Sequence, residues 1–103
     1  MKTIKCIVKR PNSKPYYTSI SNSLESLQAF VGGYIEVVPF FGYLAVICNK
    51  EGLLQNLDYN CNIAGIDFVG PIIIVGRAGE ELENIPVGLQ RLKWIFPELW
   101  EVK

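Results

Sequence analysis

The sequence predicts an α+β domain with a mainly antiparallel sheet of about five strands and two helices. Three observations lead to this prediction. Short runs of alternating apolar and polar residues, typical of strands, recur along most of the chain. Only two segments have apolar residues at the spacing that a helix requires. The predicted strands come in runs and do not alternate with helices, an order that favours α+β over a parallel α/β architecture.

The composition is that of one globular domain. The chain has 103 residues, and we assign residues 1–103 to a single domain. Its residues are 50% hydrophobic and 19% charged, so the chain is too apolar for intrinsic disorder. It contains no internal repeat, linker or low-complexity segment.

The N-terminal part predicts a β-hairpin. Apolar and polar residues alternate over residues 2–10 and again over residues 16–20. Residues 11–15 between these runs contain Pro, Asn and Ser, which favour a turn.

A helix is expected directly after this hairpin. Asn22 can act as its N-cap, and Glu25 three residues later completes a capping box. A mostly apolar stripe follows at helical spacing, formed by Leu24, Leu27, Gln28 and Val31. Gly32 or Gly33 then takes the left-handed conformation with which helices commonly end.

The middle of the chain predicts a second antiparallel hairpin. Its strands are residues 34–40 and 43–48, joined by a tight connection at Phe41 and Gly42. Residues 49–52 then form a compact turn, because Asn suits the first position of such a turn and Gly suits the last.

One more strong strand is expected after this turn. Residues 53–57 are either a short strand or an extended run, and residues 58–65 are an Asn-rich loop. Residues 68–77 are centred on four consecutive β-branched residues, which predicts a strand buried on both faces. Residues 79–83 are an acidic, solvated connection.

The last element is a helix that begins near residue 84. Its apolar stripe consists of Ile85, Leu89, Leu92 and Phe96. Pro86 is tolerated in a first turn, and Pro97 ends the helix shortly before it. Trp94 and Trp100 are expected to close the core or a dimer contact. The apolar tail is expected to pack against the domain through Leu99, Trp100 and Val102.

Charge and the absence of histidine exclude several classes of function. Ten Lys and Arg residues balance ten Asp and Glu residues, so bulk charge does not make the chain a polyphosphate binder. Without histidine, no mechanism can use an imidazole base. Arg91, Lys93 and Trp94 form a basic, aromatic corner, but a neutral domain lacks the electrostatic footprint of a nucleic-acid partner.

The three cysteines argue against a metal site. Cys6, Cys48 and Cys61 are too few for a zinc site without histidine, and we predict neither a metal nor a cofactor. Cys6 and Cys48 fit buried strand positions, and Cys61 is expected as an inert thiol in the polar loop. No signal peptide or membrane-spanning run is visible, so we expect a cytoplasmic protein with no membrane partner.

The first candidate site residues lie on the predicted strand 34–40. Tyr34 and Glu36 are two residues apart and therefore share a face with Val38. They form either a polar binding face, with Tyr34 as a platform and Glu36 as a hydrogen-bond acceptor, or simply the solvent face of a sheet. Five tyrosines in so small a domain keep the first interpretation open.

Asn49 and Glu51, in the predicted turn, are a second candidate site. Turn geometry alone accounts for the Asn and the following Gly, and ligand binding is the alternative. If Glu36 and Glu51 faced one pocket, the two carboxylates would bind a cation or take part in acid–base chemistry.

Further candidates lie on either side of the most apolar strand. Asn60, Asn62 and Asp67 flank a loop with Cys61 and can hold a small polar ligand or Mg²⁺, or else form turns with their own backbone. Arg77 is the best-placed cation for an anionic ligand, or else a surface residue beside the acidic run. We predict no catalytic residue and no metal ligand.

Two segments together resemble a known family. They are Val31-Gly32-Gly33-Tyr34-Ile35-Glu36-Val37-Val38 and Cys48-Asn49-Lys50-Glu51-Gly52. They are similar to domain-of-unknown-function family 3846, in which a Leu- and Gln-rich helix leads into Val-Gly-Gly-Tyr-Ile-Glu and an Asn-x-Glu-Gly turn follows a hydrophobic strand. Residues 57–60 and 67–70 match later family segments more loosely, because the family's proline is missing.

This resemblance covers residues 4–93 and implies a cytosolic protein of bacteria, their phages or mobile elements. It implies no activity. From the residues we predict a non-enzymatic binding or interaction module for a protein partner or a small polar ligand, a nucleotide signal included. The alternatives are a small enzyme that uses Glu36, Glu51 and Asp67, with or without a metal, and a nucleic-acid accessory protein. A free sheet edge or the Trp100 tail also gives the chain the means to form a homo-oligomer.

Overall fold

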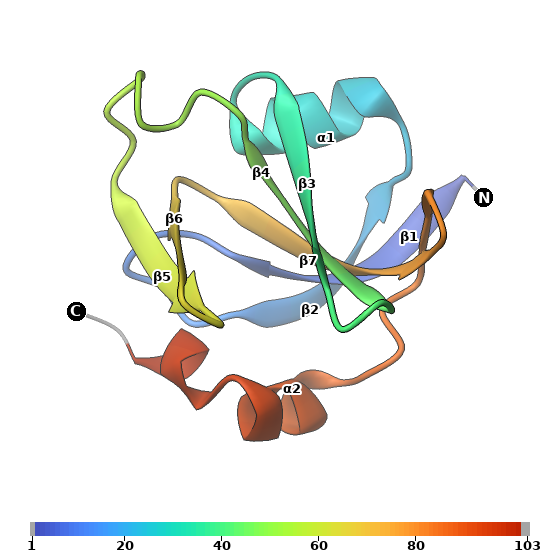
Figure 1. Cartoon of the computed structure of the whole chain (residues 1–103). Helices are drawn as coiled ribbons and strands as arrows, with labels where there is room; N and C mark the ends of the chain where they lie inside the picture. Colours follow the sequence, from blue (N-terminus) through green and yellow to red (C-terminus); the bar gives the residue numbers. More distant parts are fainter. Residues whose placement is uncertain (1, 102–103) are drawn as a thin grey trace.

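The computed structural model describes residues 2–101. Within them the chain forms a single compact α+β domain, which confirms the predicted class (Figure 1). Its elements are β1 (Thr3–Lys9), β2 (Tyr16–Ser21), α1 (Leu24–Val31), β3 (Ile35–Phe40), β4 (Leu44–Asn49), β5 (Tyr59–Ile63), β6 (Ile66–Val69), β7 (Ile72–Ala78), β8 (Glu81–Glu83), α2 (Leu89–Ile95) and the 3-10 helix η1 (Pro97–Trp100).

The main sheet has six strands, one more than the approximately five expected, and every pairing in it is antiparallel. Its order is β2-β1-β7-β4-β3, and β8 pairs with β7. Strands β5 and β6 form a second, two-stranded sheet. The hairpins β1–β2 and β3–β4 are the two that the sequence predicts.

Strand β7 changes partner along its length. Its first half pairs with β1, and its second half pairs with β8. The chain after β8 then returns to β1, where the Ile85 N–H donates to the Lys5 carbonyl at 2.8 Å. Gly76 lies at this crossing, and a side chain there would collide with the Asn84 carbonyl. The short β8 therefore fills the gap that opens as β1 and β7 diverge.

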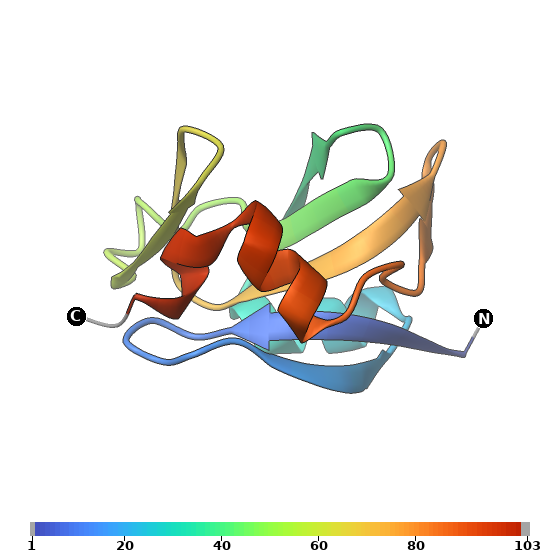
Figure 2. The same ribbon diagram turned by 90° about the horizontal axis from the view of Figure 1, so that it is seen from below.

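Packed layers cover both faces of the main sheet. Helix α1 covers one face, while α2, η1 and the β5–β6 hairpin cover the other (Figures 1 and 2). Successive side chains of β7 contribute to both cores, since Ile73 packs toward α1 and Ile74 packs toward α2. The prediction that this strand is buried on both faces is confirmed.

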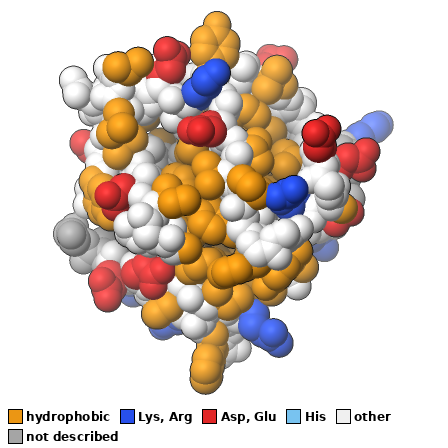
Figure 3. Space-filling view, in the orientation of Figure 1, with side chains coloured by type: hydrophobic (Ala, Val, Ile, Leu, Met, Phe, Trp, Pro, Cys, Tyr) orange, Lys and Arg blue, Asp and Glu red, His pale blue; other side chains and the backbone are white. Residues whose placement is uncertain are grey.

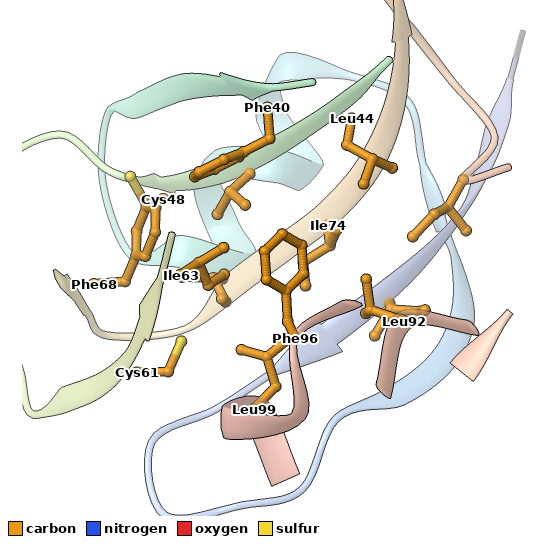
Figure 4. Packing of buried hydrophobic residues seen from close by; sticks show 14 residues of the cluster. Phe40, Leu44, Cys48, Cys61, Ile63, Phe68, Ile74, Leu92, Phe96 and Leu99 are labelled. Atoms are coloured by element: carbon orange, nitrogen blue, oxygen red, sulfur yellow. The ribbon is translucent and has the colours of Figure 1, made fainter. Parts of the chain in front are cut away.

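Aromatic side chains fill the larger of the two cores. Phe96 points from the end of α2 into the cluster, with its ring centroid 6.3 Å from that of Phe40 (Figure 4). Phe68 of β6 approaches the other side of Phe40 at 6.4 Å. Leu99 of η1 is fully buried beneath them. The expected packing of the C-terminal tail is therefore confirmed for Leu99, whereas Val102 lies outside the described residues.

The N-cap of α1 lies one residue later than predicted. Ser23, not Asn22, is the N-cap, and its Oγ accepts a hydrogen bond from the Ser26 N–H at 3.1 Å. Gly32 ends the helix in the left-handed conformation with φ 83°, as predicted.

The strands between residues 53 and 83 differ most from the sequence-based assignment. Residues 53–56 form turns and no strand, whereas the expected Asn-rich loop contains β5. The single strand expected over residues 68–77 is divided at Gly70 and Pro71 into β6 and β7. Gly70 has φ 72°, a conformation that ends the extended run. The acidic connection after Ala78 contains β8.

Helix α2 is shorter than predicted. It begins at Leu89, and Ile85 lies buried in an extended segment before it. Trp94 does not close the core, because 86% of its surface is exposed. Neither α1 nor α2, nor any other helix within residues 2–101, is long and apolar enough to cross a membrane.

Candidate functional site

A hollow of about 560 Å³ lies between the two sheets. We call it the acidic groove. Strands β3 and β4 form one wall, residues 50–54 close one end, and β6 forms the opposite wall. Its charged side chains are Glu36, Lys50, Glu51 and Asp67, and its apolar side chains include Val38, Leu53, Leu54 and Ile66. On the surface, hydrophobic side chains gather in the middle of this face with charged ones around them (Figure 3).

The register of the β3–β4 hairpin positions the first wall. Glu36 pairs with Cys48, so their side chains share the face that the β5–β6 hairpin overlies. Burial and, to a smaller extent, the nearby Glu36 carboxylate together raise the pKa of the Cys48 thiol to about 11. Cys48 is therefore a neutral, unreactive part of the wall at physiological pH.

Asn49 holds the end of the groove in shape. Its Nδ2 donates to the Val31 carbonyl and to Gln55 Oε1, both at 3.1 Å, and its Oδ1 accepts from the Glu51 N–H at 2.8 Å. The Gly52 N–H closes the turn on the Asn49 carbonyl at 3.2 Å, as predicted for this segment. The buried Asn49 side chain is thus engaged within the protein and has a structural role.

Asp67 has a comparable role in the opposite wall. Its Oδ1 accepts from the Tyr59 hydroxyl at 3.1 Å and from Asn62 Nδ2 at 2.9 Å. The pKa of Tyr59 is raised by desolvation and by this hydrogen bond. Glu36 and Glu51 differ from Asp67, because within residues 2–101 their carboxylates accept no hydrogen bond and form no ion pair. Two of the three carboxylates are therefore available to a ligand.

The structure brings together four of the seven candidate residues, namely Glu36, Asn49, Glu51 and Asp67. Tyr34 does not share the groove with Glu36. It precedes β3 and lines a smaller hollow of about 200 Å³ with Gln28, Gln55 and Glu51, and Glu51 lines the groove as well. Arg77 lies on the other face, in a hollow with Val37 and Leu82, and its Nε donates to the Gly79 carbonyl at 3.1 Å.

Asn60 lies apart from the groove, in a small hollow near the C-terminus. Its Nδ2 donates to the Lys9 carbonyl at 2.8 Å and to the Gly70 carbonyl at 2.7 Å. Cys61 beside it is buried in β5 and does not lie in an exposed loop. Burial raises the pKa of Cys61 to about 11, which agrees with the inert thiol that we expected.

Lys9 has an environment that the sequence did not reveal. It is 1% exposed, and its Nζ donates to Asn60 Oδ1 at 2.8 Å. Strand alternation places Lys9 on the same face as Ile7, and that face is covered by the β5–β6 hairpin and η1. No local feature of the sequence distinguishes Lys9 from Lys5, which lies four residues earlier on the same strand and is exposed.

The groove's apolar residues also escaped the sequence analysis. Leu53 and Leu54 follow the 49–52 turn and are strongly exposed, as is part of Ile66. A short strand or an extended run was expected over residues 53–57, whereas Leu53 and Leu54 lie exposed in turns beside the carboxylates of the groove. Although Glu36, Glu51 and Asp67 line one groove, residues 2–101 contain no group of three or more Cys, Asp or Glu side chains able to hold a metal ion.

Comparison with known proteins identifies a family. The family model described as Domain of unknown function (DUF3846) matches residues 4–94. The chain belongs to this family. The match includes α1 and strands β2 to β8 in full and β1 from its second residue, and it ends within α2. No curated protein and no solved structure shows significant similarity to the chain.

Proposed function

We propose that the protein is a non-enzymatic binding module that holds a segment of a partner protein in the acidic groove. The observation that carries this proposal is the pairing of two unengaged carboxylates, Glu36 and Glu51, with exposed Leu53 and Leu54. A groove that combines apolar area with a few charged groups suits a ligand of the same mixed character. The partner segment therefore carries basic side chains next to apolar ones.

The acidic lining favours this ligand over a nucleotide. A nucleotide needs cations or backbone N–H groups near its phosphates, and Lys50 is the only cation that lines the groove within the described residues. Arg77 and Tyr34 line other hollows, so they add nothing to a nucleotide site there. We place the protein in the cytoplasm, which is consistent with three cysteines that form no disulfide.

Selection from a phage-displayed library of random peptides on the immobilised protein tests this function. We expect the recovered peptides to be enriched in Lys or Arg beside apolar residues. The double variant Glu36→Lys and Glu51→Lys should weaken their binding by about a hundredfold, since each change replaces an attraction by a repulsion of about 1 kcal/mol or more.

The matched control is Glu81→Lys on β8, where an exposed carboxylate lies outside the groove. This variant makes the same charge change and should bind the peptides as the unmodified protein does. Peptides that bind the double variant normally, or a library that yields no binder, would contradict the proposal. Native mass spectrometry of the purified protein covers the alternative of a small polar ligand, because a retained ligand would appear as added mass.

A further inference from the structure

Strand β3 ends the main sheet, and among residues 2–101 only one of its two edges is paired. The backbone bonds on the paired side fix which groups face outward. The Lys50 N–H donates to the Tyr34 carbonyl at 2.8 Å, in register with the pairing of Glu36 with Cys48. Since bonded pairs recur at every second residue of an antiparallel ladder, Ile35 and Val37 direct their N–H and C=O groups away from β4.

Pro39 occupies the next outward position of the same edge. A proline has no N–H, and at this position its absence removes no bond from the ladder. The available main-chain groups are therefore the N–H and C=O of Ile35 and of Val37, followed by the Pro39 carbonyl. This row is long enough to pair with a short extended segment.

Hollows flank this edge on both faces of the sheet. Glu36 and Val38 line the acidic groove on the face covered by α2. Val37, Pro39 and Leu82 form the apolar part of a second hollow of about 400 Å³, which Arg77 and Glu80 also line. This second hollow, which we call the apolar hollow, lies on the α1 face, and 42% of the Val37 surface is exposed there.

We propose that the partner segment binds as an added β-strand on the free edge of β3. This inference rests on the proposed function and specifies how the groove is used. Because successive side chains of a strand point to opposite faces, an added strand would place alternate side chains over the two hollows. Basic side chains then face Glu36 in the acidic groove, and the apolar side chains between them cover Val37 and Pro39 in the apolar hollow.

Charge complementarity favours such a segment over a second copy of this chain. Antiparallel pairing of two β3 strands would bring the Glu36 of each copy toward a groove that already contains three carboxylates. It would also place a backbone carbonyl of the other copy opposite Pro39. Because proline has no N–H, that carbonyl would have no donor. Glu36 and Pro39 thus act against edge-to-edge self-pairing, as charges and prolines do on other edge strands.

Amide hydrogen exchange on the full chain, with a peptide selected from the library, tests the added strand directly. In the free protein the outward amides of Ile35 and Val37 should exchange quickly, whereas those of Glu36 and Val38, bonded to β4, should be protected. Peptide binding should slow exchange at Ile35 and Val37 by at least about tenfold and change Glu36 and Val38 little. Unchanged exchange at Ile35 and Val37 in the bound state would overturn the added strand.

A pair of modified peptides supplies a matched control with identical side chains. N-methylation of the alternate amides that face β3 should weaken binding by about tenfold for each bond lost, whereas N-methylation of the intervening amides should not. Equal effects in the two series would contradict strand addition. On the protein side, Val37→Pro removes one outward donor and should weaken binding by a similar factor, with the fold checked by circular dichroism.

The failure of this inference can be told apart from failure of the proposed function. If the charge reversals at Glu36 and Glu51 abolish binding while Val37→Pro and the N-methyl series do not, the groove binds a segment that is not a β-strand. If Ile35 and Val37 become protected at high protein concentration without peptide, and sedimentation shows a dimer, the occupant is a second copy and the inference is wrong.

Discussion

Lys9 is an ammonium group enclosed by neutral partners. Its Nζ lies 2.8 Å from Asn60 Oδ1 and 3.5 Å from the Asn60 and Arg10 carbonyls, and it forms no hydrogen bond with a carboxylate within residues 2–101. Burial lowers the pKa of Lys9 below its ordinary value of 10.5. The loss of hydration opposes folding whenever Lys9 is charged, and the hydrogen bonds to Asn60 offset part of that cost.

This environment predicts a pH dependence with a definite sign. The unfolded chain keeps the Lys9 proton up to a pH near 10.5, while the folded protein releases it at a lower pH. Between these two pKa values the unfolded state binds more protons, so the contribution of Lys9 to the free energy of unfolding rises with pH. Urea unfolding should show the protein gaining stability relative to Lys9→Met as the pH approaches 10.5.

Lys5→Met is the control for this experiment. Lys5 lies on the same strand with its side chain exposed, so Lys5→Met makes the same substitution without removing a buried charge. If the free energy of unfolding of Lys9→Met changed with pH in parallel with that of the unmodified protein, Lys9 would titrate normally and the prediction would be wrong.

The 49–52 turn is the element that joins the groove to the rest of the fold. Asn49 connects it to the end of α1 through the Val31 carbonyl and to the following residues through Gln55. Gly33 fits beside it, because a Cβ there would lie 3.0 Å from Asn49 Nδ2. The shape of the groove's closed end therefore depends on one buried amide.

Asn49→Ala should lower the free energy of unfolding by about 1–3 kcal/mol, because it leaves the Val31 carbonyl and the Glu51 N–H without partners. Gln55→Ala removes only one bond, from a more exposed side chain, and should cost about 1 kcal/mol or less. Chemical denaturation measures both values. A smaller loss for Asn49→Ala than for Gln55→Ala would contradict the structural role of Asn49.

Several elements could be predicted because their signals are local. The alternation in β1 and β7, the glycine that ends α1 and the Asn-to-Gly turn all depend on neighbouring residues in the chain. Strand β5 could not be predicted in this way. Its Asn60 side chain would be unfavourable in a buried strand, and it is accommodated by carbonyls of Lys9 and Gly70, which are distant in sequence.

For the candidate site, the sequence indicated the residues of the groove's charged lining but not the groove. Glu36, Glu51 and Asp67 are polar residues beside strands, which makes them visible as candidates. Their arrangement around one hollow depends on how the β5–β6 hairpin sits on the main sheet. Tyr34, which strand alternation places on one face with Glu36, lines a different hollow beside Gln28 and Gln55.

For the molecule as a whole, the main core is completed by a segment beyond the family match. Phe96 and Leu99 follow residue 94 and pack against strands from much earlier in the chain. Phe96 contacts the Phe40 ring edge-on and stacks with Phe41 at a centroid distance of 5.8 Å. The matched residues therefore depend on the C-terminal segment to cover their sheet.

Phe96→Ala should consequently lower the free energy of unfolding by about 3–5 kcal/mol, a large part of the stability of a small domain. Trp94→Ala is the matched control. It removes a larger aromatic ring two residues away, but that ring is 86% exposed, so the change should stay within about 0.5 kcal/mol. A loss for Trp94→Ala comparable to that for Phe96→Ala would show that Trp94 is covered, as in the dimer contact that we expected from the sequence.

The sequence by itself determined the α+β class, the antiparallel hairpins and the family, because alternation, capping and turn residues act between near neighbours. Only the tertiary structure decided which of the alternating faces would be covered. The sequence pattern of a strand's polar face is the same whether water or another layer covers that face. Lys5 and Lys9 therefore occupy equivalent positions in the alternation of β1, although Lys5 is exposed and Lys9 is buried. The acidic groove, the buried Lys9 and the exposed Trp94 all follow from how distant segments pack, which no local pattern contains.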